Sequence, residues 1–451
     1  MRINRLIIKS YRNLNDIDMT FPDSNMIAFI GNNGSGKSNL LELIARVFAY
    51  TKNCLIKGKQ FPSPDGLEEC EIDYIYDGIQ YALKYSRGSV LLIRGIAEII
   101  KKGEIENVLP KSIFLYYSGE TKRLAEVESR TIDEKYNNAL KNDKFDGYKF
   151  IEYFSAKDLD ILLLTAAVYQ GKFDETITQY ANGLQLYRPF SLLIANPRNS
   201  SAPGGEYFGA TGFVKSFLDE MRKYVTRTEE FENYLLQKRK AYAMHFADVD
   251  EIQKVAAGPS DFFAKMKALK NAGYLEKVII NFHNGGQPVL LDLLSEGEKQ
   301  ILLMKLLTEI TAMDDCLYLF DEFDSFLHLN WQRSFSSMFA GLETNGQVLF
   351  TTHSPATISG MKQKNVFVMD NGKIYHARSE TFNRSLDEIM EEQMLVTMRP
   401  KVFTDLEREF RNAVMHNQKD IAEAKLEQIR EIVGEDDPFF ITASMALRRI
   451  E

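Results

Sequence analysis

The 451-residue sequence has few cysteines, no long apolar run and no excess of positive charge. Its three cysteines, Cys54, Cys70 and Cys316, form no CxxC pair, which argues against structural zinc and a disulfide framework. No window approaches the about 18 apolar residues of a membrane span, and the start, MRINRLIIKS, lacks the pattern of a secretion signal. A net charge of −8 gives no global attraction to nucleic acid. We therefore expect a cytoplasmic protein without membrane contact.

The composition is that of an ordinary globular protein, with 45% apolar and 26% charged residues. Residues 70–94 read as antiparallel strands, with Asp77 and Gly78 as a two-residue hairpin turn. Residues 120–180 and 213–277 are mostly helical by composition. The Gly-, Pro- and Ser-rich residues 196–212 between them predict a loop or lid.

Residues 31–38, GNNGSGKS, follow a short apolar strand, MIAFI, and precede a helical pattern, NLLELIARVFAY. Strand, glycine loop and helix together form a P-loop, in which N–H groups at a helix start receive phosphate oxygens. We expect Lys37 to neutralise the β and γ phosphates of ATP and Ser38 to ligate Mg²⁺. The predicted nucleotide-binding residues are Asn32, Asn33, Gly34, Ser35, Gly36, Lys37, Ser38 and Asn39.

Residues 294–300, LSEGEKQ, precede a second helical pattern and resemble the signature motif of ABC, SMC and RecF ATPases. Taken alone, SEGE is also a capping box, with Ser295 as the cap and Glu298 reaching back. Both interpretations hold together, because the family uses this capped helix end to bind phosphate. The resemblance implies that Ser295, Gly297 and Glu298 complete the ATP site of a second protomer, so that the sites form only in a homodimer.

Residues 317–320, LYLF, form a buried-strand pattern that ends in an acidic pair and resembles a Walker B motif. In that resemblance Asp321 holds Mg²⁺ through water, and Glu322 is the general base that polarises the attacking water. Asp324 lies in the D-loop, where the family's aspartate crosses the dimer. A further strand, QVLFTT, ends at His353, which is similar to the histidine that senses the γ phosphate. For the family's Q-loop glutamine, Gln60 and Gln80 both remain open.

The resemblance implies an α/β fold: an ABC-type P-loop ATPase head with a mixed sheet, an antiparallel β subdomain, a helical insertion and a C-terminal helical hairpin. The expected parts are 1–119 (P-loop and β subdomain), 120–277 (helical insertion), 278–380 (signature, Walker B, D-loop and switch histidine) and 381–451 (C-terminal helices). In the hairpin, the apolar positions are Leu406, Phe410 and Val414 in one helix and Ala422, Leu426, Ile429 and Val433 in the next.

Within this family, the chain resembles the ATPase subunit of Septu anti-phage systems. The similarity lies in IFLYYSGETKRL (113–124), DEFDSFLHLNWQ (321–332), the compact insertion and the hairpin with EDDP. It implies a slow ATPase in a complex larger than a dimer, with a small HNH nuclease subunit and DNA contacts through that complex. The remaining histidines are dispersed at no ligand spacing, so we expect no nuclease activity of the chain's own.

Two alternatives remain open. One is a RecF-like repair ATPase that binds DNA directly, and the other is an ATP-gated scaffold for a different effector, as in PARIS-type systems. Direct DNA affinity with a steep salt dependence would favour the first.

Overall fold

The structure is a computed structural model, and its chain folds into two compact units, Met1–Asn383 and Arg384–Glu451. It describes residues 1–57, 64–119, 123–131, 133–145, 147–180, 185–197, 206–234, 239–284, 287–289, 291, 294–340, 344–393, 401–434 and 437–448. The helices are α1 (Lys37–Lys57), α2 (Arg123–Arg130), α3 (Glu134–Lys141), α4 (Leu159–Val168), α5 (Asp174–Tyr180), α6 (Gly212–Arg222), α7 (Pro259–Asn271), α8 (Glu296–Ile310), α9 (Leu329–Ala340), α10 (Pro355–Ile358), α11 (Leu386–Glu392), α12 (Lys401–Met415), α13 (Lys419–Val433) and α14 (Phe439–Leu447).

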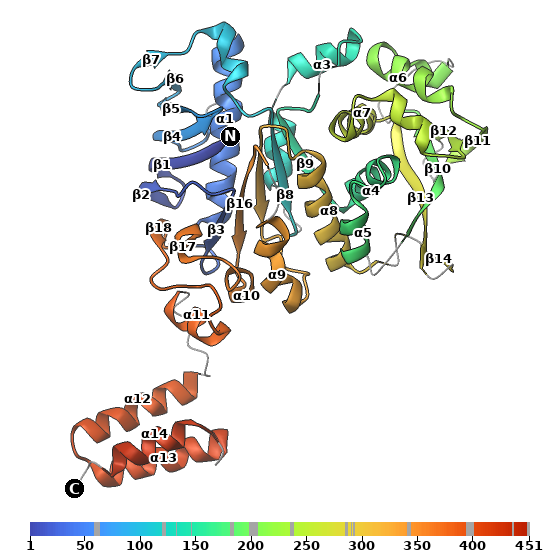
Figure 1. Ribbon diagram of the computed structural model, residues 1–451. Helices are drawn as coiled ribbons and strands as arrows, with labels where there is room; N and C mark the ends of the chain where they lie inside the picture. Colours follow the sequence, from blue (N-terminus) through green and yellow to red (C-terminus); the bar gives the residue numbers. More distant parts are fainter. Residues whose placement is uncertain are drawn as a thin grey trace. The chain divides into compact units, whose positions relative to one another are not determined.

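A seven-stranded sheet of order β18-β17-β3-β16-β15-β8-β9 forms the middle of the first unit (Figure 1). Its strands are β3 (Met26–Ile30), β8 (Ser112–Tyr117), β9 (Ile151–Phe154), β15 (Cys316–Asp321), β16 (Gln347–Thr352), β17 (Val366–Asp370) and β18 (Lys373–His376). All neighbours from β17 to β9 are parallel, and β18 is antiparallel at one edge. Strands β3, β15 and β16 are buried over their full lengths, as continuous apolar runs in central parallel strands are.

The register brings the carboxyl ends of the central strands to one edge of this sheet. Thr352 of β16 lies opposite Ile30 of β3, and Asp321 of β15 lies opposite Tyr117 of β8. The loops that follow these four strands therefore meet, which is where parallel α/β sheets bind ligands.

The second sheet is antiparallel, has six strands of order β2-β1-β4-β5-β6-β7, and packs against α1. Its strands are β1 (Arg2–Tyr11), β2 (Leu14–Thr20), β4 (Glu69–Tyr76), β5 (Ile79–Ser86), β6 (Ser89–Arg94) and β7 (Glu98–Ile99). The rings of Phe48 on α1 and Tyr74 on β4 lie 5.7 Å apart at this contact. The predicted hairpin is confirmed: Asp77 and Gly78 join β4 to β5 with φ of 49° and 71°, as a tight hairpin turn requires.

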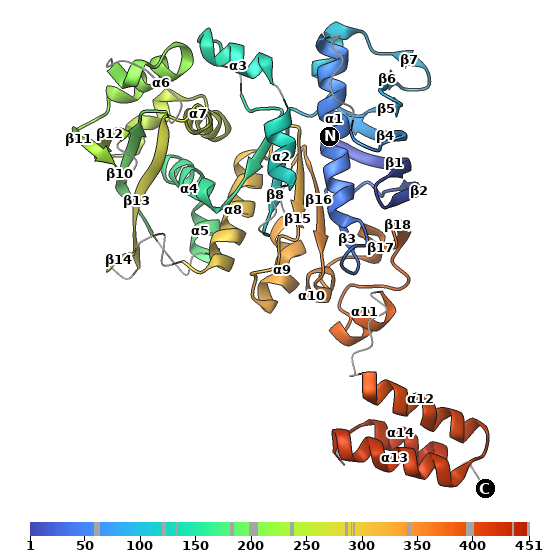
Figure 2. The ribbon, with the colours of Figure 1, turned by 180° about the vertical axis from the view of Figure 1, so that it is seen from behind.

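The insertion differs from the mainly helical segment that composition predicted. Besides α4, α6 and α7 it contains a five-stranded antiparallel sheet of order β11-β12-β10-β13-β14, on the side of the central sheet away from the six-stranded sheet (Figures 1 and 2). Its strands are β10 (Gln185–Ala195), β11 (Arg227–Tyr234), β12 (Arg239–Phe246), β13 (Leu275–Asn284) and β14 (Gln287–Val289). The prediction for 213–277 was wrong for β11 and β12, because their Glu, Lys, Ala and Met content favours helix while cross-strand packing decides for a strand. Of the predicted loop 196–212, residues 198–205 lie outside the described residues.

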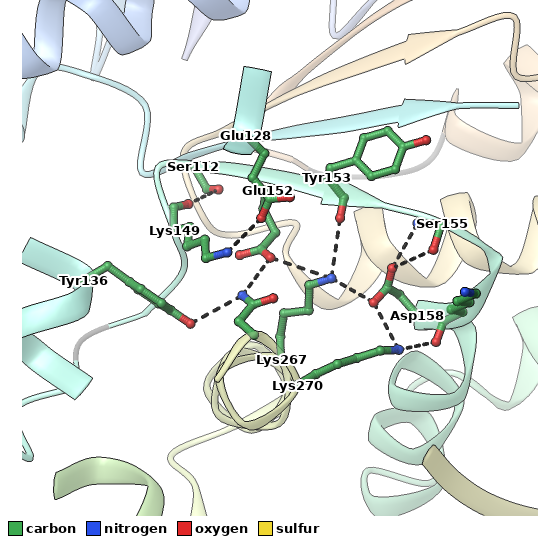
Figure 3. Close-up of polar contacts among 12 residues, drawn as sticks. Ser112, Glu128, Tyr136, Lys149, Glu152, Tyr153, Ser155, Asp158, Lys267 and Lys270 are labelled. Carbon is green, nitrogen blue, oxygen red and sulfur yellow. Dashed lines mark hydrogen bonds and ion pairs between the residues drawn. The ribbon is translucent and has the colours of Figure 1, made fainter. Parts of the chain in front are cut away.

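A buried charge cluster joins the insertion to the edge of the central sheet (Figure 3). The Nζ atom of Lys267 on α7 lies 2.7 Å from Asp158 Oδ1 and 3.6 Å from Glu152 Oε1 of β9. Lys270 reaches the same Asp158 oxygen at 3.2 Å, and the Asn271 amide donates to Glu152 Oε1 at 2.9 Å. Burial by itself raises the pKa of Asp158, but the two ammonium groups outweigh it and hold that pKa at about 2. This cluster fixes α7 against β9.

The C-terminal unit contains the predicted helical hairpin, α12 and α13, followed by α14. Its core consists of Phe403, Phe410, Ala413, Ala422, Leu426, Ile429, Phe439 and Ala443. The ring of Phe439 on α14 packs edge-on against Phe403 and Phe410 at centroid distances of 5.4 and 5.7 Å. In the described parts of the chain, no helix combines the length and apolar character that crossing a membrane requires.

We expect Lys267→Met to lower the free energy of unfolding of the Met1–Asn383 unit by about 3 kcal/mol, because it leaves two buried carboxylates without their main cation. Urea denaturation measures this loss. The matched change Lys270→Met, at a side chain that is 20% rather than 6% exposed, should cost about 1 kcal/mol or less. Since the pKa of Asp158 is lowered, its contribution is present above pH about 4 and is lost as the pH falls towards 2. Equal, small losses in both variants would contradict this account of the cluster.

Candidate ATP-binding site

The P-loop runs from the end of β3 into the first turn of α1. Lys37 is 4% exposed, and its Nζ donates to the carbonyl oxygens of Gly31 and Asn32 at 2.8 and 3.1 Å. Burial lowers the pKa of Lys37 to about 8, against the opposing effect of Glu322 and Asp321. The buried hydroxyl of Ser35 has no hydrogen-bond partner among the described residues. Ammonium and hydroxyl are thus donors at a helix start that phosphate oxygens fit.

Asp321, at the end of β15, and Ser38, in the first turn of α1, come together beside the P-loop. Asp321 is 2% exposed; burial raises its pKa, while hydrogen bonds from the hydroxyls of Thr351 and Ser38 lower it. The Thr351 hydroxyl lies 2.5 Å from Asp321 Oδ1. Hydroxyl and carboxylate oxygens are ligands that Mg²⁺ prefers, so this pair fits a nucleotide-bound Mg²⁺.

Glu322 and His353 face each other across the same edge. His353 Nε2 lies 3.3 Å from Glu322 Oε1, and its Nδ1 lies 3.5 Å from Lys37 Nζ. Burial and the neighbouring Lys37 ammonium lower the pKa of His353, so the imidazole is neutral at pH 7. A neutral ring with its proton on Nε2 donates to Glu322 and accepts from Lys37. The three predicted residues therefore form one chain of polar contacts at the position expected for the γ phosphate.

The signature segment begins α8 and has the predicted capping box. The Ser295 hydroxyl accepts from the Glu298 N–H at 3.2 Å, and the Glu298 carboxylate accepts from the Ser295 N–H at 2.8 Å. Gly297 packs against the D-loop: a Cβ there would lie 2.7 Å from the carbonyl oxygen of Phe326, so only glycine allows this approach. Ser295 itself is exposed at the surface of the single chain.

Asp324 points into its own protomer. It is 3% exposed, and its Oδ2 accepts short hydrogen bonds from the hydroxyls of Thr352 and Thr357. Burial raises the pKa of this carboxyl, while the two hydroxyls lower it. The single chain thus gives Asp324 a role in holding the D-loop to the end of β16. Its contact across a dimer stays a prediction.

Two residues beside the P-loop, Asn13 and Arg12, belong to no motif in the sequence. They lie in the turn between β1 and β2. Asn13 donates from Nδ2 to the Gly34 carbonyl at 2.8 Å and accepts from Asn39 Nδ2 at 2.6 Å. Beside it, Arg12 pairs with the buried Glu42 of α1 at 2.7 Å. Their only signal in the sequence is a polar turn, RN, at the end of an alternating strand.

Arg123 of α2 also pairs with Glu42, at 2.8 Å, although more than 80 residues separate them in the chain. Of the two Q-loop candidates, Gln80 is not brought to this site: it lies on β5, where its side chain pairs with Asn4 at 2.9 Å. Gln60 lies outside the described residues.

A P-loop, an acidic pair and a histidine at the carboxyl edge of a parallel sheet define a P-loop ATPase. The chain belongs to the AAA ATPase domain family, which matches residues 1–358. The family implies nucleotide binding.

Two retron proteins are similar over nearly the whole chain. The retron Ec83 probable ATPase of Escherichia coli is 23% identical over 472 aligned positions, covering 92% of this chain and 80% of that protein. The retron Vc95 probable ATPase of Vibrio cholerae serotype O1 biovar El Tor is 19% identical, covering 94% and 86%.

Two solved structures are also similar to the chain. The SMC head domain from Thermotoga maritima has a TM-score of 0.42 at 15% identity, covering 84% of this chain and 100% of that one. The recombination mediator protein RecF with ATP has a TM-score of 0.35 at 13% identity, covering 83% and 98%.

We expect Asp324→Ala to destabilise the ATP-free chain by about 2 kcal/mol, because two buried threonine hydroxyls lose their acceptor. Thermal unfolding without nucleotide measures the effect. Ser334→Ala, at an exposed position of α9 where the hydroxyl donates to the Asn330 carbonyl of the same helix, is the control and should change stability by about 0.5 kcal/mol or less. Unchanged stability of Asp324→Ala without ATP, with a defect only in ATP-dependent dimerisation, would assign the residue to the dimer contact instead.

Proposed function

We propose that the chain hydrolyses ATP as a head-to-tail homodimer and acts as the regulatory subunit of an anti-phage defence complex. The observation that carries the ATPase part is the convergence of Lys37, Asp321, Glu322 and His353 at one sheet edge. The signature motif, by contrast, lies at the start of a different helix, α8, and its Ser295 is exposed. This separation supports sites completed by a second copy, each combining Lys37 of one chain with Ser295 of the other.

In the proposed reaction, Lys37 and the P-loop N–H groups hold the phosphates. Ser38 and Asp321 would hold Mg²⁺, which would neutralise charge on the transferred phosphoryl group. Glu322 accepts a proton from the attacking water as its oxygen bonds to the γ phosphorus. The bond from that phosphorus to the β–γ bridging oxygen breaks, which leaves ADP and phosphate. His353 orients Glu322. Because it directly follows β16, its contact with the γ phosphate makes the position of that strand's end depend on bound ATP.

The defence role rests on the two retron relatives and on the segments that resemble the Septu ATPase subunit. In this proposal ATP closes the dimer and hydrolysis reopens it, which reshapes the surface that holds a small HNH nuclease subunit. DNA is contacted through that complex, which is larger than the dimer. The chain itself contributes ATP hydrolysis and no cleavage of DNA.

We expect two inactive variants, Lys37→Ala and Ser295→Arg, to restore hydrolysis when mixed. In an equimolar mixture about half of the dimers contain one copy of each variant, and each of these has intact Lys37 and Ser295 at one of its two sites, so the rate should return to about a quarter of the native rate. A phosphate-release assay measures it. The control mixture, Lys37→Ala with Glu322→Gln, must stay inactive, because both residues belong to the same half of the site. Failure of the first mixture to recover, with dimers present, would rule out the composite site.

We expect a small HNH protein to co-purify in stoichiometric amount when the chain is isolated from its native operon with ATP. Mass spectrometry identifies the partner, and Lys37→Ala shows whether nucleotide binding changes its retention. A different effector, such as a Toprim nuclease, would instead support the scaffold alternative. A chain that arrives alone and binds DNA ends with a steep salt dependence would contradict the proposal and favour direct action in repair.

A further inference from the structure

The backbone of Glu322 is held in an unfavourable conformation. Its φ is +49°, in the left-handed region. For a residue with a Cβ atom this conformation costs about 1–3 kcal/mol, so it persists only where the surrounding structure imposes it. Glu322 follows directly after β15, so this turn decides where its carboxylate points. Something outside β15 must therefore fix the turn.

Two hydroxyl groups from neighbouring strands hold the backbone of Glu322. The Thr351 hydroxyl of β16 accepts from the Glu322 N–H at 3.0 Å, and the same hydroxyl donates to Asp321. On the other side, the Ser118 hydroxyl donates to the Glu322 carbonyl oxygen at 2.5 Å. Ser118 directly follows β8, and its own N–H lies 3.4 Å from the carbonyl oxygen of Asp321.

A third hydroxyl, that of Ser325, also donates to the Glu322 carbonyl, at 2.9 Å. It belongs to the same turn, three residues on, so it closes the turn without fixing it to the sheet. Ser118 and Thr351 are the contacts that tie the turn to β8 and β16. Of these, the Thr351 hydroxyl also donates a hydrogen bond to Asp321. In the described structure, the hydrogen bonds of Ser118 to the ATP site go to this turn alone.

We propose that Ser118 is a positioning residue for ATP hydrolysis: its hydroxyl fixes the strained turn that directs the Glu322 carboxylate to the attacking water. This inference rests on the proposed role of Glu322 as the general base. Without the Ser118 hydroxyl, the turn loses its tie to β8, and Glu322 spends less time within reach of His353. ATP binding is unaffected, because Ser118 contacts neither the P-loop nor Lys37 in the described structure.

The test measures kcat, KM and nucleotide affinity of Ser118→Ala beside two comparison variants. We expect kcat to fall by about fivefold to tenfold, the loss of one hydrogen bond, with KM and affinity unchanged. Ser118→Thr retains the hydroxyl and should recover most of kcat. Ser112→Ala makes the same change at the other end of β8, where the hydroxyl donates to the Lys149 carbonyl at 2.7 Å, and should leave kcat unchanged.

Ser118→Ala in a Glu322→Gln background distinguishes the positioning role of Ser118 from the general-base role of Glu322. If Ser118 acts through Glu322, Ser118→Ala should lower the residual rate of Glu322→Gln by less than twofold. An equal fall in both backgrounds, or a native kcat in Ser118→Ala while Glu322→Gln is inactive, would overturn the role of Ser118 alone. A native rate in Glu322→Gln would overturn the assignment of the general base itself.

Discussion

The parallel register of β3, β16, β15 and β8 is the constraint on which the ATP site depends. Each strand ends at the same edge, so loops that are almost 300 residues apart in the chain become neighbours: the P-loop after β3 and the acidic pair after β15. A one-residue slip between β15 and β16 would carry Thr351 away from Asp321, and Thr352 away from Asp324, because side chains in a strand alternate between the two faces. The chemistry therefore depends on strand pairing before it depends on any single side chain.

Hydroxyl groups, rather than cations, hold the buried acids at this edge. Asp321 accepts from Thr351, and Asp324 accepts from Thr352 and Thr357. A neutral donor satisfies a carboxylate without cancelling its charge, and carboxylate oxygens are ligands that Mg²⁺ prefers. The Arg12 and Arg123 side chains, which could neutralise such a carboxylate, pair with Glu42 of α1. These two guanidinium groups are therefore engaged by Glu42 rather than by Asp321 or Asp324.

The sequence predicted those parts of the site whose chemistry is local. GNNGSGKS and SEGE each combine a turn with the helix that follows, and LYLFDE and QVLFTTH each end a buried strand at a polar residue, so short windows contain the whole signal. Ser118, Arg12 and Arg123 could not be found in this way, because their partners come from other strands and helices. Strands β11 and β12 were missed for a related reason: their composition favours helix, and the pairing of β12 with β10 and of β11 with β12 fixes them as strands.

The buried cluster around Lys267 determines how the insertion is attached to the ATPase sheet. Its carboxylates belong to β9 and to the turn before α4, and its cations belong to α7, so the cluster joins the two parts through charge as well as apolar packing. Separating a buried ion pair leaves an uncompensated charge, and the free-energy cost of this is higher than that of shifting one apolar surface along another. The attachment therefore resists hinge motion between β9 and α7. Since β9 pairs with β8, and β8 pairs with β15, the insertion is connected to the acidic strand through two ladders of backbone hydrogen bonds.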